Sequence, residues 1–449
     1  MVKSVFVVMT ALVSVWAAFA SAQGDNVPPP NSIDDIITKV LQDNQDIRPA
    51  SPPSQTKTKA SSQLPVVMSA RVIGSADRTR FVVELSDPLN LRTFTLNNPN
   101  RVVIDMPAVQ WRLDEALRLT SHGAIHSYRY GLFRPGNARF VLDLNQAVST
   151  SDPLIIPPGN GFGYRVVFDL VPISQSKFDQ TVGWPADLKK QDAVAERQVS
   201  LPTQSAGKND ARKTIVIDPG HGGIDSGTNG VNGLLERDLV LDEGIRLTKA
   251  LRRNAKYAVY MTRATDTFIP LGERVNINRT HKADLFISLH ADSNPDPSVA
   301  GLSVYTLSES GSDKEAAALA RKENQSDVIA GVDLGGENSA VAPILIDLEQ
   351  RDTMNKSSRF AELVVNALSR VTDILPRQPH RSAAFVVLKA PDVPSILIEL
   401  GYLSNMSDAE QMNTARWRND VAEAIATAVG RHFAIGEASA PTVAGPVSE

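Results

Sequence analysis

The segment Thr214–Gly223, TIVIDPGHGG, is an apolar run that ends in a proline- and glycine-rich turn and presents one histidine. The β-branched residues at its start favour a strand, and the Pro-Gly pair favours a sharp turn after it. A histidine in this position can serve as a metal ligand, because neutral imidazole binds metal ions well. The segment therefore predicts a strand whose carboxyl end carries His221 into a functional site.

Two further apolar runs end in residues that can bind a metal or move a proton. The run Asp284–His290, DLFISLH, ends in a histidine, and the run Ser395–Leu400, SILIEL, contains Glu399. Function in open α/β sheets lies beyond the carboxyl ends of the strands. A single histidine at a strand end is more often structural, but the shared placement of three such residues favours a functional site.

His221, His290 and the intervening Glu236 form a set that is typical of a catalytic zinc site. Two imidazoles and a carboxylate leave one coordination position open for water, so we expect one zinc ion per catalytic domain. The chain has no cysteine, which excludes thiolate ligands and disulfides. Asp218 is expected to order the turn that carries His221. Asp225 is most simply interpreted as a turn or helix-cap residue.

Glu399 is the candidate general base. A glutamate that lies near the metal without binding it can take a proton from water and return it to the leaving nitrogen. The alternative is a buried carboxylate paired with Arg381 or another basic residue. We favour catalysis, because an unpaired acid directly after an apolar run is costly without a function.

These motifs resemble the zinc-dependent N-acetylmuramoyl-L-alanine amidases of bacterial cell-wall remodelling. The matching residues run in order over about 212–433: Asp218 to Gly223, the Glu236 segment, Thr262, Arg263, Asp266, Leu271, Arg274, Ser288 to Asp292, and Leu388 to Asn405. The resemblance implies a hydrolase that cuts the amide bond between N-acetylmuramic acid and L-alanine in peptidoglycan, for septal wall splitting and daughter-cell separation. Two alternatives stay open: another zinc peptidase or carboxypeptidase of peptidoglycan, and a non-catalytic wall-binding protein.

An insertion at about 308–350 contains Lys314–Asn324, KEAAALARKEN, a strong helix former by composition. A second helical stretch is expected at Ile344–Leu348. The resemblance implies an autoinhibitory helix that plugs the active site, in which Glu323 binds the zinc until an activator protein displaces the helix. The alternative is an ordinary solvated helix face.

Residues 213–435 alternate predicted strands and helices, which indicates an α/β catalytic domain with a largely parallel sheet covered by helices on both faces. Residues 66–172 differ, with short alternating strands and two internal echoes: residues 79–86 resemble 138–145, and residues 100–107 resemble 164–172. These echoes predict a small all-β domain of two similar halves. The resemblance implies that this domain targets the enzyme to peptidoglycan.

The remaining segments are interpreted from composition. Residues 1–22 are typical of a cleavable signal peptide, so we expect a periplasmic protein without a transmembrane segment in its mature chain. Residues 23–65 are expected to form a flexible tether, residues 173–212 a linker and residues 436–449 a flexible tail. The net charge of −4 offers no electrostatic reason to expect a nucleic acid as partner.

Overall fold

The structure is a computed structural model that describes residues 64–113, 121–159, 161–185, 212–332 and 348–438. The predicted signal peptide, most of the tether and linker, and the helical stretch expected at 344–347 lie outside the described residues. Within those residues, no helix is long and apolar enough to cross a membrane.

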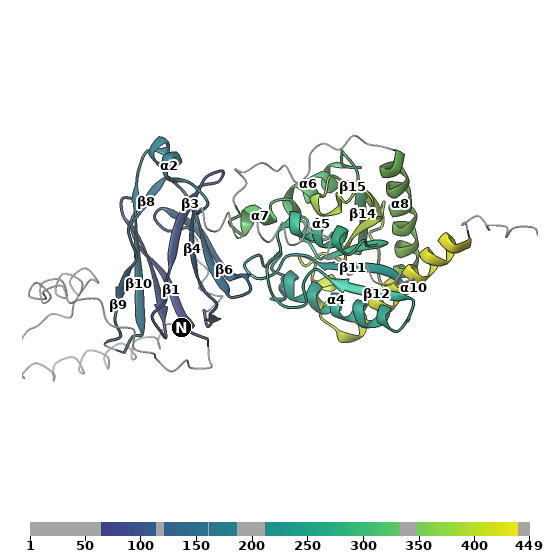
Figure 1. The fold of residues 1–449 in the computed structure, drawn as a ribbon, viewed down its shortest axis with the longest axis horizontal. Coiled ribbons are helices and arrows are strands. Elements are labelled where there is room, and N and C mark those ends of the chain that lie inside the picture. Colours follow the sequence, from purple (N-terminus) through teal and green to yellow (C-terminus); the bar gives the residue numbers. More distant parts are fainter. Residues whose placement is uncertain (1–63, 114–120, 160, 186–211, 333–347, 439–449) are drawn as a thin grey trace, which may run out of the picture. The chain divides into compact units, whose positions relative to one another are not determined.

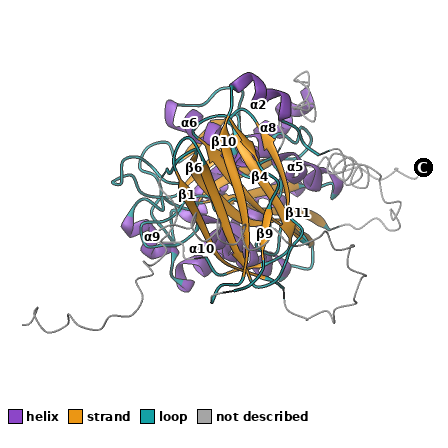
Figure 2. Ribbon diagram, turned by 90° about the vertical axis from the view of Figure 1, so that its left-hand side faces the viewer, coloured by secondary structure: helices purple, strands orange, loops and turns teal. Residues whose placement is uncertain are grey.

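The β domain consists of two sheets whose strands are orange in Figure 2. The strands of the first sheet, in spatial order, are β5 (Gln110–Trp111), β1 (Val66–Gly74), β2 (Thr79–Leu85), β10 (Tyr164–Pro172) and β8 (Val148–Thr150), with β9 (Leu154–Ile156) also paired to β10. The strands of the second sheet are β3 (Arg92–Leu96), β4 (Arg101–Pro107), β7 (Asn137–Leu144) and β6 (Ile125–Arg134). Apolar residues of both sheets form one core.

The sequence echoes correspond to equivalent strand pairs. In the first sheet β2 pairs antiparallel with β10, and Val82 lies opposite Val167. In the second sheet β7 pairs antiparallel with β4, and Val141 lies opposite Val103. Each sheet therefore contains one copy of each echo in the same register, which confirms the prediction of an all-β domain with two similar halves.

The α/β domain is built on a six-stranded sheet (Figure 1). Its strands, in spatial order, are β12 (Tyr257–Met261), β11 (Lys213–Pro219), β13 (Leu285–His290), β16 (Ser395–Glu399), β14 (Ser303–Leu307) and β15 (His380–Ala383). The first four strands are mutually parallel, whereas β14 runs antiparallel to β16. The sheet is thus largely parallel, as predicted.

Helices cover both faces of this sheet because alternate strand residues point to opposite sides. Ile215 and Ile217 of β11 pack in a core with α4 (Glu236–Arg252), α8 (Leu348–Leu368) and α10 (Ala415–Ala438). Val216, which lies between them, packs in a second core with α5 (Leu271–Thr280), α6 (Lys314–Glu323) and the 3₁₀ helix η3 (Val386–Leu388). The predicted cover of helices on both faces is confirmed.

Four segments differ from the sequence prediction. The expected linker begins with α2 (Gln175–Thr181), in which Phe178 is fully buried. The sequence predicts one helix over Asp408–His432, but this region is divided into α9 (Met406–Met412) and α10, because the Thr414 hydroxyl accepts a hydrogen bond from the Trp417 amide and starts a new helix. The sequence predicts a loop over Gln378–Arg381, whereas residues His380–Ala383 form the edge strand β15. The expected tail begins inside α10, which ends at Ala438.

Candidate metal centre

The turn after β11 places His221 above the carboxyl end of the sheet. His221 adopts a φ of 54°, a left-handed conformation that costs free energy in a residue other than glycine. Gly220 leaves room for the second histidine, since a Cβ there would lie 2.4 Å from the His290 ring. The strained backbone is held from behind by Arg274, which donates to the carbonyl oxygens of Pro219 and His221 at 2.8 and 2.7 Å.

Asp218 supports this turn through a buried network. Its carboxylate accepts hydrogen bonds from Thr262 at 2.6 Å, Arg274 at 2.7 Å and Ser288 at 2.8 Å. Burial raises the pKa of Asp218, but the charge of Arg274 and the hydroxyl donors outweigh it and hold the pKa below its usual value. Asp218 is therefore a buried anion that ties together β11, β13 and α5.

Glu236 and His290 reach the same point from two other elements. Glu236 is the first residue of α4, and His290 is the last residue of β13. The Glu236 carboxylate is fixed by the amides of Thr228 and Ala291, which donate to Oε2 at 2.8 Å and to Oε1 at 2.9 Å. Its Oε1 lies 3.0 Å from His221 Nε2 and 3.3 Å from His290 Nδ1.

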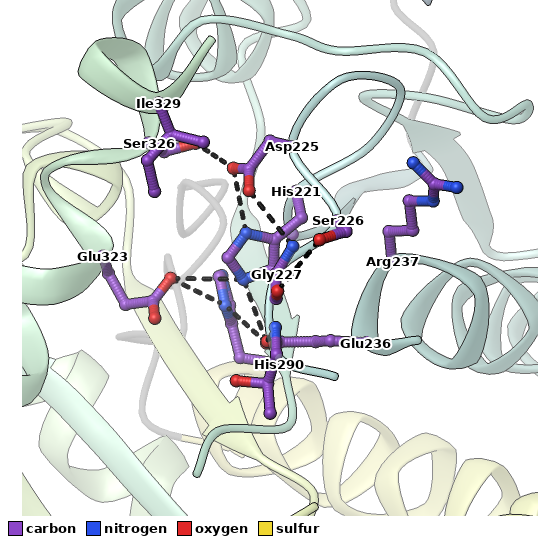
Figure 3. A network of polar contacts seen from close by, with 12 residues as sticks. His221, Asp225, Ser226, Gly227, Glu236, Arg237, His290, Glu323, Ser326 and Ile329 are labelled. Atoms are coloured by element: carbon purple, nitrogen blue, oxygen red, sulfur yellow. Dashed lines mark hydrogen bonds and ion pairs between the residues drawn. The ribbon is translucent and has the colours of Figure 1, made fainter. Parts of the chain in front are cut away.

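Glu323, the last residue of α6, completes the cluster (Figure 3). Its Oε2 lies 3.4 Å from His221 Nε2 and 3.1 Å from His290 Nδ1. The ligand atoms of a tetrahedral zinc site with bonds of about 2.0–2.1 Å are separated by about 3.3 Å. The potential ligand atoms of His221, His290 and Glu323 all lie within 4.8 Å of one another, so the arrangement has the dimensions of a metal site.

The hydrogen bonding of this cluster is incomplete in a way that a cation would satisfy. His221 Nε2 and His290 Nδ1 are buried and have no hydrogen-bond partner among the described residues. Buried polar atoms without partners are rare, because leaving them unsatisfied is costly. A metal ion bound by imidazole nitrogen fits the atoms that are left over.

The electrostatics of the cluster also favour positive charge. Burial lowers the pKa of His221, but the carboxylates of Glu236, Asp225 and Glu323 outweigh it and raise the pKa well above its usual value. Burial likewise opposes the charged form of His290, yet Glu323 and Glu236 raise its pKa to about 10. In both cases the surrounding carboxylates stabilise a cation at the centre of the cluster.

Glu399 lies beside this centre at the end of β16. It is fully buried and is the register partner of His290 on the neighbouring strand. Its Oε2 accepts a hydrogen bond from the Asp292 amide at 2.9 Å, whereas its buried Oε1 has no hydrogen-bond partner in the described structure. Burial raises the pKa of Glu399 well above its usual value. Arg381, the alternative partner considered from the sequence, has its Nε 3.5 Å from Asp313.

Comparisons with known proteins agree on one family. The model of the N-acetylmuramoyl-L-alanine amidases matches residues 215–431, and the model of the AMIN domain matches residues 70–161. The amidase AmiC of Escherichia coli O6:H1 is 36% identical over 400 residues, which cover 85% of this chain and 92% of that relative. The chain belongs to the N-acetylmuramoyl-L-alanine amidase family.

Two other comparisons concern members of the same family. The amidase AmiC of Neisseria meningitidis serogroup B is 34% identical over 380 residues, covering 82% of this chain and 90% of that relative. The solved structure of the amidase AmiC2 of Nostoc punctiforme is 29% identical and covers 51% of this chain and 99% of that chain, with a TM-score of 0.37.

Asp225 contacts a residue of the candidate metal centre, which the sequence analysis did not predict. Its Oδ2 lies 3.0 Å from His221 Nδ1, on the side of the ring that faces away from the cluster, and it accepts a hydrogen bond from Ser326 at 2.5 Å (Figure 3). A carboxylate on the outer nitrogen fixes the tautomer and orientation of a metal-binding histidine. The sequence signal was only a short spacing from His221 within a glycine-rich loop, which is typical of many turns.

A groove lies next to the candidate metal centre. It has a volume of about 670 Å³, and its lining includes Asp292, Asn294, Tyr305, Lys322, Arg381 and Tyr402. Helix α6 forms part of its wall through Leu319 and Lys322. The Lys322 ammonium forms an ion pair with Asp292 and lies 3.1 Å from the Thr228 hydroxyl. Helix α6 therefore contacts both the metal-binding cluster and the groove.

Proposed function

We propose that this amidase is a zinc enzyme that hydrolyses the amide bond between N-acetylmuramic acid and L-alanine, and that α6 holds it in a resting state. The observation that carries the proposal is the convergence of His221, Glu236, His290 and Glu323, with neighbouring nitrogen and oxygen atoms 3.0–3.4 Å apart. His221, Glu236 and His290 would hold the zinc in the active state, and Glu323 would occupy the remaining position at rest.

The residues around the zinc have separate roles. When bound, zinc polarises the amide carbonyl and lowers the pKa of water from about 15.7 to near 7. Asp225 keeps His221 in the tautomer that presents Nε2 to the cluster. Glu399 accepts the proton of the attacking water on its unpaired Oε1 and returns it to the leaving nitrogen.

The resting state is supported by two contacts of neighbouring residues on α6. Glu323 Oε2 lies beside both histidines, and Lys322 forms an ion pair with Asp292 at the groove. A substrate that needs the open position must displace both side chains. A protein activator would act by preferring the conformation in which α6 has moved away, which shifts a two-state equilibrium.

Family membership supports a proposal for the substrate and the location. The substrate is peptidoglycan, at the septum where daughter cells separate, and the AMIN domain would target the enzyme there. Such a substrate requires export, for which residues 1–22 are the proposed signal peptide and the periplasm the proposed location. A peptidase of the stem peptide and a non-catalytic wall-binding protein are the alternatives that the experiment separates.

Product analysis on purified sacculi tests the reaction. We expect intact stem peptides with a free L-alanine amino terminus, together with uncut glycan strands. Products cut within the stem peptide would indicate a peptidase instead, and the absence of any product at full zinc loading and with α6 deleted would indicate a binding protein.

The variant Glu399→Gln tests the general base. The amide keeps the shape of the side chain but cannot accept the proton, so we expect a loss of about 10²–10⁴-fold in rate with unchanged zinc content. Glu243→Gln is a matched control, because Glu243 is also a fully buried glutamate whose pKa is raised by burial, but it lies within α4. A parallel loss of zinc in Glu399→Gln would make Glu399 a ligand rather than a base.

A further inference from the structure

The short helix α7 (Ser326–Ile329), which follows the inhibitory helix α6, contacts the β domain through its carbonyl end. Successive carbonyl oxygens from residue 328 to residue 331 accept hydrogen bonds from arginines of strands β4, β6 and β7. The pairs are Arg101 with Val328 at 2.6 Å, Arg129 with Ile329 at 3.1 Å, and Arg139 with Ala330 at 3.2 Å and with Gly331 at 3.1 Å.

These contacts match the chemistry of a helix end. The last carbonyl groups of a helix have no partners within it and carry a partial negative charge. Arginine provides a permanent positive charge and several donors in a rigid plane. The three arginines therefore satisfy the carbonyl groups in both hydrogen bonding and charge.

Two of the three arginines are held in position by acidic partners on the same sheet, and Arg101 donates to the carbonyl oxygens of Pro99 and Asn97. Arg139 is fully buried and donates to both carboxylate oxygens of Asp105, at 2.5 and 2.8 Å. Arg129 donates to both carboxylate oxygens of Asp143, and its Nη2 lies 2.9 Å from Asp143 Oδ1. The guanidinium groups are thus oriented by the β domain itself, so that α7 meets a preformed surface.

The internal repeat of the β domain shows that these ion pairs belong to its fold. Arg71 lies opposite Val82 in the first sheet, and Arg129 lies opposite Val141 at the equivalent position of the second sheet. Arg71 also has an acidic neighbour, Glu84, at 4.0 Å. The side chain of Arg71 is 57% exposed, compared with 28% for Arg129. Both halves of the β domain have an arginine at this position, and in the second half that arginine also donates to the Ile329 carbonyl at the end of α7.

Apolar packing adds to the contact. Ala330 is fully buried in a cluster with Val103, Phe133 and Val141 of the β domain. Gly331 has a φ of 69°, and a Cβ there would lie 3.0 Å from Val141 Cγ2 and 3.2 Å from Val103 Cγ2. The end of α7 therefore fits closely against the sheet.

The opposite end of the same segment is fixed at the metal centre. Glu323 lies beside the two histidines, and Ser326 donates to Asp225, the residue that orients His221. Asp327 accepts a hydrogen bond from the Leu271 amide at 3.0 Å. The segment Glu323–Gly331 is thus attached at one end to the catalytic site and at the other end to the β domain.

We propose that this face of the β domain is a docking surface for α7 that restrains the inhibitory helix in its resting position. The proposal rests on the resting state proposed above. Moving Glu323 away from the histidines displaces α7, so the arginine contacts add to the free energy of opening. Loss of the docking contacts makes opening more frequent without any change at the metal ligands or at Glu399.

The test uses the full-length, zinc-loaded chain with variants on both sides of the contact. Arg129→Ala removes one donor from the β domain, and Arg71→Ala is its control at the equivalent repeat position. Gly331→Val crowds the docking surface, and Gly136→Val is its control, because Gly136 also has a positive φ, of 82°, but open space around it.

Two measurements are made on each variant: amide hydrogen exchange of residues 320–331 and release of stem peptides from labelled sacculi without an activator. Arg129→Ala and Gly331→Val are expected to raise exchange in that segment about 10-fold or more over their controls, as for the loss of a charge-assisted hydrogen bond. Basal peptide release is expected to rise in the same variants. Unchanged exchange in β10 shows that the β domain remains folded.

The outcomes separate this proposal from the resting state itself. Unchanged exchange of residues 320–331 in both variants overturns the docking surface. Raised exchange without raised peptide release also overturns the restraint, provided that Glu323→Ala does activate the enzyme. If Glu323→Ala fails to activate, the proposed resting state is wrong, and the exchange data alone then decide whether the β domain holds α7.

Discussion

Replacing Arg274 with alanine should destabilise the catalytic domain by removing the cation beneath the His221 turn. The Arg274 guanidinium and the Asp218 carboxylate are 2.7 Å apart, with side chains only 2% and 1% exposed. Breaking such a buried pair leaves an uncompensated charge and costs about 3–5 kcal/mol of unfolding free energy. The carbonyl oxygen of His221 loses the Arg274 donor as well, whereas the carbonyl oxygen of Pro219 keeps the Arg263 donor at 3.0 Å.

A second arginine on the same helix provides the control. Arg279 lies 3.8 Å from Asp392, and both side chains are more than half exposed. Surface pairs of this kind contribute about 0–1 kcal/mol. Arg279→Ala should therefore leave the unfolding free energy nearly unchanged, although it removes the same type of side chain from α5.

The effect should depend on pH in a defined direction. The pKa of Asp218 in the folded protein lies below the ordinary value of 3.8, so the stability from its ionised form is fully present above pH 3.8. This contribution is lost as the pH falls from 3.8 toward the lower, folded-state pKa. The difference between wild type and Arg274→Ala should therefore be largest near neutral pH and narrow below pH 3.8.

Urea unfolding in the presence of a chelator, followed by circular dichroism of the helices, measures the difference. The long helices α4, α8 and α10 all belong to the catalytic domain, so the signal reports that domain. A loss no greater than that of Arg279→Ala would refute the reasoning. So would a difference that stays constant through the acidic range.

Three further predictions concern the site and the division of labour between domains. His221→Ala should lose zinc and activity together, and stoichiometric zinc with full turnover in this variant would contradict the ligand assignment. Glu323→Ala should raise the basal rate of sacculus digestion at equal zinc occupancy, whereas an equal or lower rate with an intact fold would assign Glu323 a purely structural role. Residues 64–185 alone should sediment with sacculi without cutting them, and a failure to sediment would leave the targeting role without support.

Much of the architecture could be predicted from local patterns. The apolar runs that end in His221, His290 and Glu399 indicated three strands, and parallel pairing then brings their carboxyl ends to one edge. The echoes in the β domain likewise indicated equivalent strands. Burial and backbone preference are encoded residue by residue, so they are visible without knowledge of the fold.

Short elements were harder to predict. The strand β15 has four residues, and α2 has seven. A segment of that length contains too few repeats of either period to distinguish a helix, a strand and a loop. Packing against partners decides their conformation, as with the buried Phe178 of α2.

What the sequence alone determined is the set of chemically capable residues and the elements that carry them: His221, His290 and Glu399 at strand ends, and a helix over Lys314–Asn324 that contains Glu323. Only the tertiary structure decided how these residues meet other parts of the chain. Asp225 became the partner of His221 because the turn folds back on itself, and Arg129 meets the carbonyl of Ile329 across 200 residues of sequence. The physical reason is that such pairs depend on which faces pack together, and no local pattern records the neighbour across an interface.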